Sequence, residues 1–224
     1  MLIVLEGLDG AGKSTQVELI KEFYASRNRE VKFLHFPRFD SPIYGGLIAS
    51  FLRGDFGSVE SVHPKLVALL FAGDRGDAAY IIKSWIEQGY IVILDRYYYS
   101  NIAFQCAKVK DLSQREELRN WIIDTELTQF SIPKPDINLF LDVPISFVKE
   151  RLNESREGAD REYLKGKSDI HEADISFQES VREIYLMEVA KGPDLIRIDC
   201  STPKGDMASP TEIFSKVITY LREF

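Results

Sequence analysis

The chain has 224 residues, a formal net charge of −7, and 45% hydrophobic and 12% aromatic residues. This length fits one domain or at most two, and the composition supplies a large apolar core. A net negative charge argues against a general binder of polymeric nucleic acid, whose surface should be basic. No apolar run approaches the roughly eighteen residues of a membrane span, and no signal peptide is visible, so we expect no contact with a membrane.

The two cysteines, Cys106 and Cys200, form neither a metal-binding nor a redox spacing. Free thiols without a disulfide framework suit a reducing compartment, and we therefore expect a cytoplasmic protein. His35, His63 and His171 lie far apart along the chain, which argues against a histidine metal site.

The start of the chain carries the most specific pattern. An apolar run, residues 2–5, precedes GLDGAGKS at residues 7–14, which matches G-x-x-x-x-G-K-[ST] at every fixed position. The glycines let the backbone turn so that its N–H groups converge on phosphate oxygens at the start of a helix. A glycine-rich turn without a ligand is the alternative, but the strand before it and the helix after it favour phosphate binding. The residues assigned to ATP are Gly7, Leu8, Asp9, Gly10, Ala11, Gly12, Lys13, Ser14 and Thr15.

Side chains near this loop have predicted roles in phosphate and metal binding. Lys13 should reach the β- and γ-phosphates of ATP, and the Ser14 hydroxyl should bind Mg²⁺. Asp95 follows the apolar run 91–94 and stands where a further Mg²⁺ ligand is expected. The predicted cofactor is therefore Mg²⁺, with ATP as co-substrate.

Apolar periodicity predicts strands that alternate with helices along the chain. The predicted elements after the first strand are a helix at 12–28, a strand at 31–36, a short helix at 42–52, a long helix at 64–87, strands at 91–94, 137–141 and 195–198, and helices at 113–127, from 144, at 176–190 and from 209. Ser113 with Glu116, and Ser209 with Glu212, read as capping boxes. The pattern predicts an α/β fold with a doubly wound, five-stranded parallel sheet in one domain, residues 1–224. The charged segment 151–170 is equally compatible with a solvated face and a mobile lid.

Ligands of such sheets bind beyond the carboxyl ends of the strands. Arg38 and Arg96 follow two of these strands, where an arginine can bind a phosphate through two parallel hydrogen bonds. A surface salt bridge is the alternative for each, and it is favoured more for Arg38. Phe71 and Arg75 share one helix face, which suits a flat heterocycle, although a phenylalanine there is also typical of a core.

The chain resembles the thymidylate kinases, which phosphorylate dTMP to dTDP with ATP. The resemblance covers essentially the whole chain and is carried by residues 6–15, the triplet Phe36-Pro37-Arg38, residues 70–75 (LFAGDR) and residues 95–104 (DRYYYSNIAF). It implies a P-loop fold like that of nucleoside monophosphate kinases and a place in nucleotide biosynthesis, supplying dTTP for DNA synthesis. It also implies a homodimer.

The resemblance implies roles for individual residues around the acceptor. Phe71 would stack on thymine, Arg75 would donate a hydrogen bond to a base carbonyl, and Ser100 and Asn101 would read the base edge. Phe104, a tyrosine in many relatives, would pack under the deoxyribose and disfavour a 2′-hydroxyl. Asp9 would contact the 3′-hydroxyl or the magnesium ion, and Arg96 would bind the acceptor phosphate. The substrate-binding residues implied are Asp9, Phe36, Pro37, Arg38, Phe71, Arg75, Arg96, Ser100, Asn101, Phe104, Asp169 and Glu172.

Some relatives carry an arginine within the P-loop, where this chain has Ala11. The chain thus resembles the bacterial type, which supplies basic residues from the lid, and Arg151, Arg156 and Arg161 are candidates. The predicted catalytic residues are Lys13, Arg96, Asp9, Arg156 and Arg161, and the predicted metal ligands are Ser14, Asp9 and Asp95. His171 stands where a tyrosine is common in relatives.

Two other functions stay open from the sequence. One is another P-loop kinase of nucleotides, and the other is a P-loop switch or assembly protein without a small-molecule acceptor. The guanine-binding tetrapeptide Asn-Lys-x-Asp is absent, which argues against a GTPase. The presence of Lys13 and Arg96 argues against a non-catalytic regulator.

Overall fold

The computed structural model describes residues 1–59, 61–153, 159–166, 169–171 and 175–221. Its centre is a five-stranded sheet in the order β2-β3-β1-β4-β5, and every neighbouring pair of strands is parallel. The strands are β1 (Leu2–Gly7), β2 (Val31–His35), β3 (Ile91–Asp95), β4 (Ile137–Asp142) and β5 (Ile196–Asp199). This arrangement confirms the predicted fold class.

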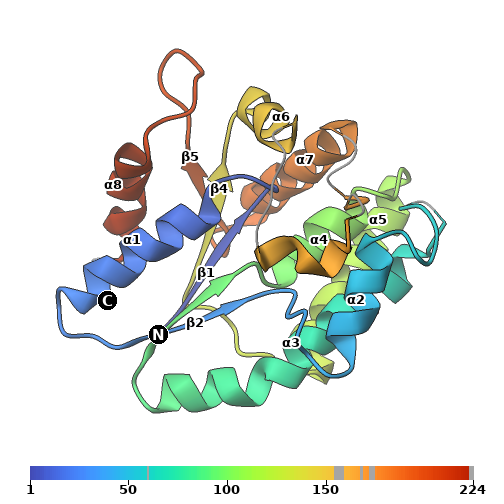
Figure 1. Ribbon diagram of the computed structural model, residues 1–224, viewed down its shortest axis with the longest axis horizontal. Helices are drawn as coiled ribbons and strands as arrows, with labels where there is room; N and C mark the ends of the chain where they lie inside the picture. The colour runs from blue at the N-terminus through green and yellow to red at the C-terminus, as the bar shows by residue number, and fades with distance from the viewer. Residues whose placement is uncertain (60, 154–158, 167–168, 172–174, 222–224) are drawn as a thin grey trace.

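Helices cover both faces of the sheet, with α1 and α8 on one side and α4 and α7 on the other (Figure 1). The helices are α1 (Lys13–Ala25), α2 (Tyr44–Leu52), α3 (Pro64–Glu87), α4 (Tyr98–Cys106), α5 (Leu112–Ile123), α6 (Ile145–Asn153), α7 (Ile175–Lys191) and α8 (Pro210–Leu221), with a π turn, η1 (Asp124–Gln129), and a 3₁₀ turn, η2 (Ala159–Leu164). In the described part of the chain, no helix has both the length and the apolar character needed to cross a membrane.

The three inner strands are buried along their whole length, whereas the edge strand β2 is partly exposed. A strand covered on both faces needs apolar side chains at every position, which explains why the sequence shows apolar runs rather than alternation. In the sheet register, Leu5 of β1 lies opposite both Asp95 of β3 and Leu139 of β4. The residues that follow β1 and β3 therefore meet at one edge of the sheet.

One predicted capping box is confirmed and the other is wrong. The Ser209 N–H donates to Glu212 Oε2 at 2.8 Å, and the Glu212 N–H returns to Ser209 Oγ at 3.3 Å. At the start of α5, Asp111 is the cap instead, and its Oδ1 accepts from the Gln114 N–H at 2.8 Å. Ser113 lies inside the first turn, because aspartate two residues earlier is an equally good cap.

Helix α4 was not predicted, although it supplies part of the cavity described below. Each of its nine residues is buried. A helix packed on all sides lacks the apolar stripe that marks a surface helix, so periodicity does not reveal it.

A smaller apolar cluster joins α2 to α3 and contains Ile48, Phe51, Leu52 and Val67. Tyr163 of η2 packs against this cluster, and its ring stacks on Phe39 with centroids 3.8 Å apart. The described part of segment 151–170 is therefore more than a solvated face, because part of it contributes to this cluster.

Candidate active site

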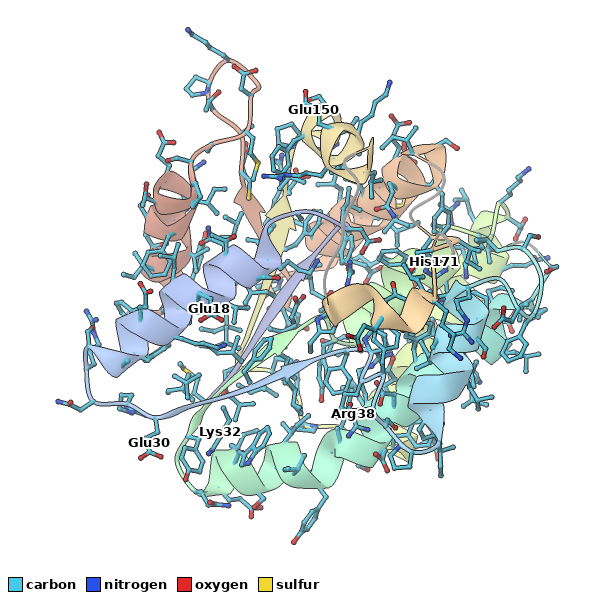
Figure 2. The ribbon with its side chains drawn as sticks, in the orientation of Figure 1. Glu18, Glu30, Lys32, Arg38, Glu150 and His171 are labelled. Atoms are coloured by element: carbon cyan, nitrogen blue, oxygen red, sulfur yellow. The ribbon has the colours of Figure 1, made fainter. Side chains whose placement is uncertain are left out.

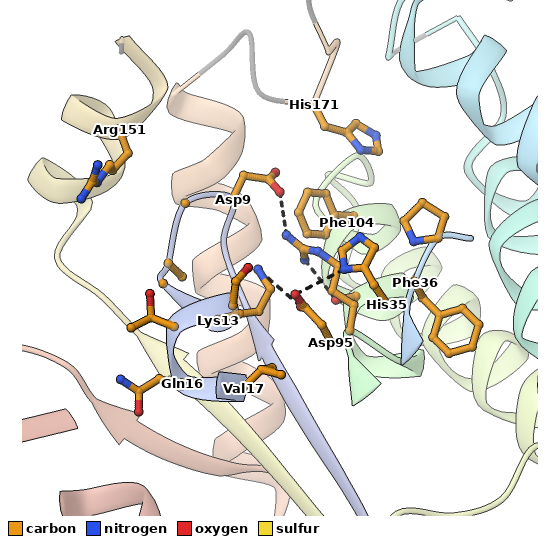
Figure 3. A pocket seen from close by; sticks show the side chains of 18 of the residues that line it. Asp9, Lys13, Gln16, Val17, His35, Phe36, Asp95, Phe104, Arg151 and His171 are labelled. Atoms are coloured by element: carbon orange, nitrogen blue, oxygen red, sulfur yellow. Dashed lines mark hydrogen bonds and ion pairs between the residues drawn. The ribbon is translucent and has the colours of Figure 1, made fainter. Parts of the chain in front are cut away.

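A cavity of about 830 Å³ lies at the carboxyl edge of the sheet. One end is lined by the loop after β1 and by side chains of α1, α6 and the segment before α8; the other end is lined by side chains of α3, α4 and the loop after β2 (Figure 3). The two ends meet around Asp9, Lys13, Asp95 and Arg96.

Three glycines shape the loop after β1. Gly7, Gly10 and Gly12 all have positive φ, at 156°, 76° and 79°. At Gly7, an added Cβ would also lie 3.2 Å from the Leu141 carbonyl oxygen of the neighbouring strand. Positive φ favours glycine at all three positions, and close packing adds to this requirement at Gly7, so the motif reflects the path of the backbone.

The Lys13 side chain folds back over the loop. It is 7% exposed, and its Nζ donates to the Leu8 carbonyl at 3.1 Å and lies 3.9 Å from Asp95 Oδ1. Burial, followed by repulsion from Arg96, lowers the pKa of Lys13 from its usual value. The amine thus stands at the meeting point of the two cavity ends.

Asp95 has the chemistry of a ligand for a magnesium ion held partly by phosphate, and Ser14 lines the same cavity. Asp95 Oδ1 is buried without a hydrogen-bond partner, and Oδ2 lies 3.3 Å from His35 Nδ1. Burial alone would raise the pKa of Asp95, but Lys13, His35 and Arg96 hold it below its usual value, so the carboxylate stays ionised. Among the described residues, no group of three or more His, Cys, Asp or Glu gathers to hold a metal. Mg²⁺ needs few protein ligands when phosphates and waters complete its octahedron.

Arg96 directly follows β3 and has a φ of 68°. Its Nη2 donates to Asp9 Oδ1 at 2.6 Å, and its Nη1 donates to Ser100 Oγ at 3.1 Å. The guanidinium carbon lies 5.0 Å from the centroid of the Phe104 ring. Burial would raise the pKa of Asp9, but Arg96 and Lys13 hold it below its usual value. The structure thus brings Arg96 together with Asp9, Ser100 and Phe104, all of which the sequence placed in one site.

Arg75 and Asn101 meet on a glutamate that was not predicted. Arg75 is 1% exposed and donates through Nε and Nη2 to Glu126 at 2.5 and 2.7 Å. Asn101 Nδ2 donates to Glu126 Oε1 at 2.8 Å and to the Ala68 carbonyl at 3.0 Å, while Asn101 Oδ1 is buried without a partner. All three side chains are buried, and Arg75 and Asn101 line the cavity next to Phe71.

Arg38 makes the salt bridges that its alternative reading anticipated. Arg38 lies beside α3 (Figure 2). Its Nε donates to Asp74 Oδ1 at 3.0 Å and its Nη2 to Asp77 Oδ2 at 2.6 Å, and both acids belong to α3. Phe36 and Pro37 line the cavity, whereas Arg38 lines a shallower groove beside β2. A role for Arg38 in substrate binding stays a prediction.

The residues predicted near the lid are described only in part. Arg156 and Glu172 lie outside the described residues, as does the side chain of Arg161. Asp169 lines the cavity and accepts from the Tyr163 hydroxyl and the His171 N–H, both at 2.7 Å. The roles implied for these residues stay predictions.

His171 is enclosed by aromatic rings at the end of the cavity that α3 and α4 line. Its ring lies 5.2 to 5.4 Å from those of Phe51, Phe104 and Phe177, and its Nε2 is buried without a partner. Burial, followed by repulsion from Lys108, lowers the pKa of His171 well below 6.5, so the imidazole is neutral.

Several lining or supporting residues escaped the sequence reasoning. They are Gln16, Phe147, Met207, Pro210 and Ile213 at the P-loop end, Glu126 below Arg75, and Gln178, whose Nε2 donates to Asp9 Oδ2 at 3.0 Å. These residues carry no local motif, because helices distant in sequence bring them together. Arg151, a lid candidate, also lines the P-loop end.

A phosphate-binding loop on a parallel sheet, with an acid after the neighbouring strand and a second cavity end beside it, defines a P-loop kinase of the nucleoside monophosphate type. The family model described as thymidylate kinase matches residues 5–209. The chain therefore belongs to the thymidylate kinase family and is a phosphotransferase.

Related proteins support this assignment along most of the chain. A probable thymidylate kinase of Thermococcus kodakarensis is 38% identical over 200 residues, covering 87% of each chain. The thymidylate kinase of Mycobacterium tuberculosis is 33% identical over 192 residues, covering 86% of this chain and 87% of its own. The fold also matches a solved thymidylate kinase structure from Candida albicans, with a TM-score of 0.74, 24% identity, and coverage of 99% of this chain and 91% of that one.

Proposed function

We propose that this chain phosphorylates dTMP to dTDP with ATP, with the donor at the P-loop end of the cavity and the acceptor at the Phe71–Arg75 end. The observation that carries this proposal is the continuity of the cavity, which joins Lys13 and Arg96 to the buried group around Arg75 and Asn101. Family membership supports the same reaction.

ATP binds with its phosphates on residues 7–15. Phe147, Arg151, Met207 and Ile213 line the same end of the cavity and offer apolar surface and a guanidinium to the adenine ring. Flat aromatic heterocycles bind well between such groups.

Phosphoryl transfer here depends on positioning and charge neutralisation. The acceptor is a phosphate that is largely ionised at neutral pH, so a strong general base is not needed. Lys13 and Arg96 neutralise the transferring group, and a lid arginine, Arg156 or Arg161, completes the charge. Mg²⁺ bound by Ser14 and Asp95, with Asp9 nearby, would neutralise the phosphate oxygens of ATP.

The whole chain acts as one domain, with segment 151–170 as a lid over the donor. Closure of such a lid excludes water, which would otherwise hydrolyse ATP. Tyr163 supports this role, because its ring stacks on Phe39, a lining residue of the cavity outside the segment, with centroids 3.8 Å apart.

The acceptor end suits thymine better than cytosine. Phe71 offers a ring face, and the unpartnered Asn101 Oδ1 can accept the N3–H of thymine. Cytosine presents an acceptor at N3 and would leave this buried oxygen unpaired, which costs about 1–3 kcal/mol. Phe104 places an apolar ring where a 2′-hydroxyl would need a partner.

A substrate panel tests this proposal by measuring kcat/KM for dTMP, dUMP, UMP, dCMP and dGMP under one condition. The expected order is dTMP above dUMP above UMP, with dCMP and dGMP poor. Loss of the 5-methyl group should cost about 1 kcal/mol, and a 2′-hydroxyl about 1–3 kcal/mol. A preference for UMP, dCMP or a purine over dTMP would contradict the thymidylate assignment and favour another nucleotide kinase.

The chain forms a homodimer through the outer faces of α2 and α3. Leu66 and Tyr80 of α3 are 61% and 84% exposed, and Ile43, directly before α2, is 67% exposed. Large apolar side chains left exposed on neighbouring elements are candidates for a two-fold interface. Light scattering at micromolar concentration should give twice the mass of one chain for the wild type. The Leu66→Asp variant should give the mass of a single chain. A wild-type monomer would refute the dimer.

The free thiols of Cys106 and Cys200 support a cytoplasmic location.

A further inference from the structure

A buried carboxylate stands directly before the phosphate-binding loop. Glu6 ends the apolar run of β1 and is 0% exposed, and it does not belong to the cavity lining among the described residues. A charge in such a place is costly unless every oxygen is hydrogen-bonded. Its partners therefore indicate what the charge is for.

Three donors satisfy Glu6, and each comes from a different place. The Tyr97 N–H donates to Oε1 at 2.9 Å, the Tyr185 hydroxyl of α7 donates to Oε2 at 3.0 Å, and the Ser100 hydroxyl of α4 donates to Oε2 at short range. Tyr185 also lies 2.8 Å from Ser100 Oγ. All of these groups are buried, so no water replaces a lost bond at low cost.

Two of these bonds lead to Arg96. Tyr97 is the next residue in the chain, and its N–H is fixed by Glu6 while Arg96 holds the left-handed φ of 68°. Ser100 donates its only proton to Glu6, and its oxygen accepts from Arg96 Nη1 at 3.1 Å. Glu6 therefore constrains both the backbone and the guanidinium of Arg96.

The other side of the guanidinium is held by Asp9, at 2.6 Å from Nη2. Asp9 belongs to the loop that binds ATP, whereas Glu6 belongs to the rigid centre of the sheet. Burial raises the pKa of Glu6, and Ser100 and then Arg96 act against that rise. The arrangement gives Arg96 one anchor on the loop and one in the core.

We propose that Glu6 is a positioning residue that acts through Ser100 and Tyr97 to aim the Arg96 guanidinium at the acceptor phosphate. The inference rests on the proposed function, since it takes Arg96 as the ligand of that phosphate. Glu6 itself does not touch the substrate.

The test compares binding of dTMP with binding of thymidine, which lacks the phosphate. In Glu6→Gln, an amide replaces the carboxylate that accepts from Ser100, so the serine oxygen and the guanidinium lose their fixed orientation. We expect the Kd of dTMP to rise on the order of tenfold. The Kd of thymidine and the KM of ATP should stay unchanged.

Asp142→Asn is the matched control. Asp142 is 2% exposed, ends the neighbouring strand β4 and pairs with Arg182 and Arg197, none of which contacts Arg96 among the described interactions. Both Asp142→Asn and Glu6→Gln should lower the melting temperature, but Asp142→Asn should leave the ratio of the two dissociation constants unchanged. Tyr185→Phe removes one hydrogen bond from Glu6 and keeps the charge, and it should shift the ratio by about threefold even if Glu6→Gln fails to fold.

A double-variant cycle locates the route. If Glu6 acts through Ser100, the variant with both Glu6→Gln and Ser100→Ala should bind dTMP about as weakly as the weaker single variant. Equal weakening of dTMP and thymidine, an unchanged ratio in both Glu6→Gln and Tyr185→Phe, or a raised KM for ATP alone would each overturn the inference. The wild-type chain is measured first. If it binds thymidine and dTMP equally, the role of Arg96 in binding the phosphate is refuted. If it binds neither, the proposed function itself is refuted.

Discussion

The two ends of the cavity are built in different ways. At the P-loop end, consecutive residues 7–15 form the site, and the backbone does most of the shaping through the positive φ angles of three glycines. At the acceptor end, Arg75, Asn101 and Glu126 come from three elements, and Arg75 and Glu126 are 51 positions apart. Where the backbone shapes the site, a side-chain substitution can change binding or catalysis with little effect on the stability of the fold. Where buried charged side chains form the site, a substitution should change ligand binding and stability together.

Removing the Lys13 amine should have the largest effect on catalysis. Lys13→Ala should lower kcat by about 10²-fold or more, because a preorganised charge at the transferring phosphate is lost. The melting temperature should change little, since the loop path is fixed by backbone. A coupled ADP-release assay and a thermal melt measure the two effects.

Lys21→Ala is the control for this variant. Lys21 lies on the same helix, pairs with Glu18 at the surface and places its Nζ 4.4 Å from the centroid of the Phe33 ring, away from the P-loop. Surface pairs of this kind contribute little to stability. Its turnover should match that of the wild type. A folded Lys13→Ala chain with unchanged kcat would contradict the assignment of the P-loop end.

Breaking the Arg75–Glu126 pair should damage stability and acceptor binding together. Glu126→Gln leaves the Arg75 guanidinium buried without its counter-charge, and breaking such a pair typically costs about 3–5 kcal/mol. The KM for dTMP should rise on the order of tenfold, because Arg75 and Asn101 lose their common anchor, while the KM for ATP should not change. Denaturant unfolding and steady-state kinetics measure both.

Glu117→Gln is the matched control, because Glu117 lies exposed on α5 and pairs with Lys65 on the surface. It should change the unfolding free energy by less than about 1 kcal/mol. If Glu126→Gln lowered stability but left the KM for dTMP unchanged, the pair would be structural, and the coupling of the two properties at this end would be wrong.

The same contrast explains what the sequence could predict. The five strands could be predicted from short apolar segments of the sequence. The P-loop could be predicted from the spacing of its glycines, lysine and serine. Asp95 and Arg96 follow from the rule that ligands lie beyond strand ends, and the structure places them beside Asp9 and Lys13. These inferences need only short-range information.

The residues that support the acceptor end required the tertiary structure. Glu126 lies in a π turn, where the Phe130 N–H bonds to the Thr125 carbonyl at 2.9 Å, and nothing in the sequence marks that irregularity. Tyr185 reaches Glu6 across 179 positions. Ser100, which the resemblance assigned to the base edge, donates its proton to Glu6 in the structure. Side-chain pairs of this kind depend on how the helices pack against each other, and the apolar periodicity of the sequence does not predict them.

The smallest predicted effect is on the unfolding free energy in mild acid, to which the two ends of the cavity should respond differently. The pKa values of Asp9 and Asp95 at the P-loop end lie below 3.8, so the stability they contribute is present above that pH and is lost only as the pH falls further. The pKa of His171 lies well below 6.5 in the folded chain. Between the pKa of His171 in the unfolded chain and its lower pKa in the folded chain, the unfolded chain binds a proton that the folded chain does not. Stability from His171 is therefore complete above about pH 6.5 and falls as the pH drops below it.

The unfolding free energy of wild type and His171→Phe, measured between about pH 5 and 7, tests this last effect. Phenylalanine fills the space between Phe51, Phe104 and Phe177 and cannot titrate. The wild-type curve should fall toward acid by up to about 1.4 kcal/mol per pH unit relative to the variant. Glu6, whose pKa burial raises, is common to both chains, so the difference between the curves isolates the histidine. Parallel curves would show that His171 is protonated as easily in the folded chain as in the unfolded one, and that the acceptor end does not exclude the charge.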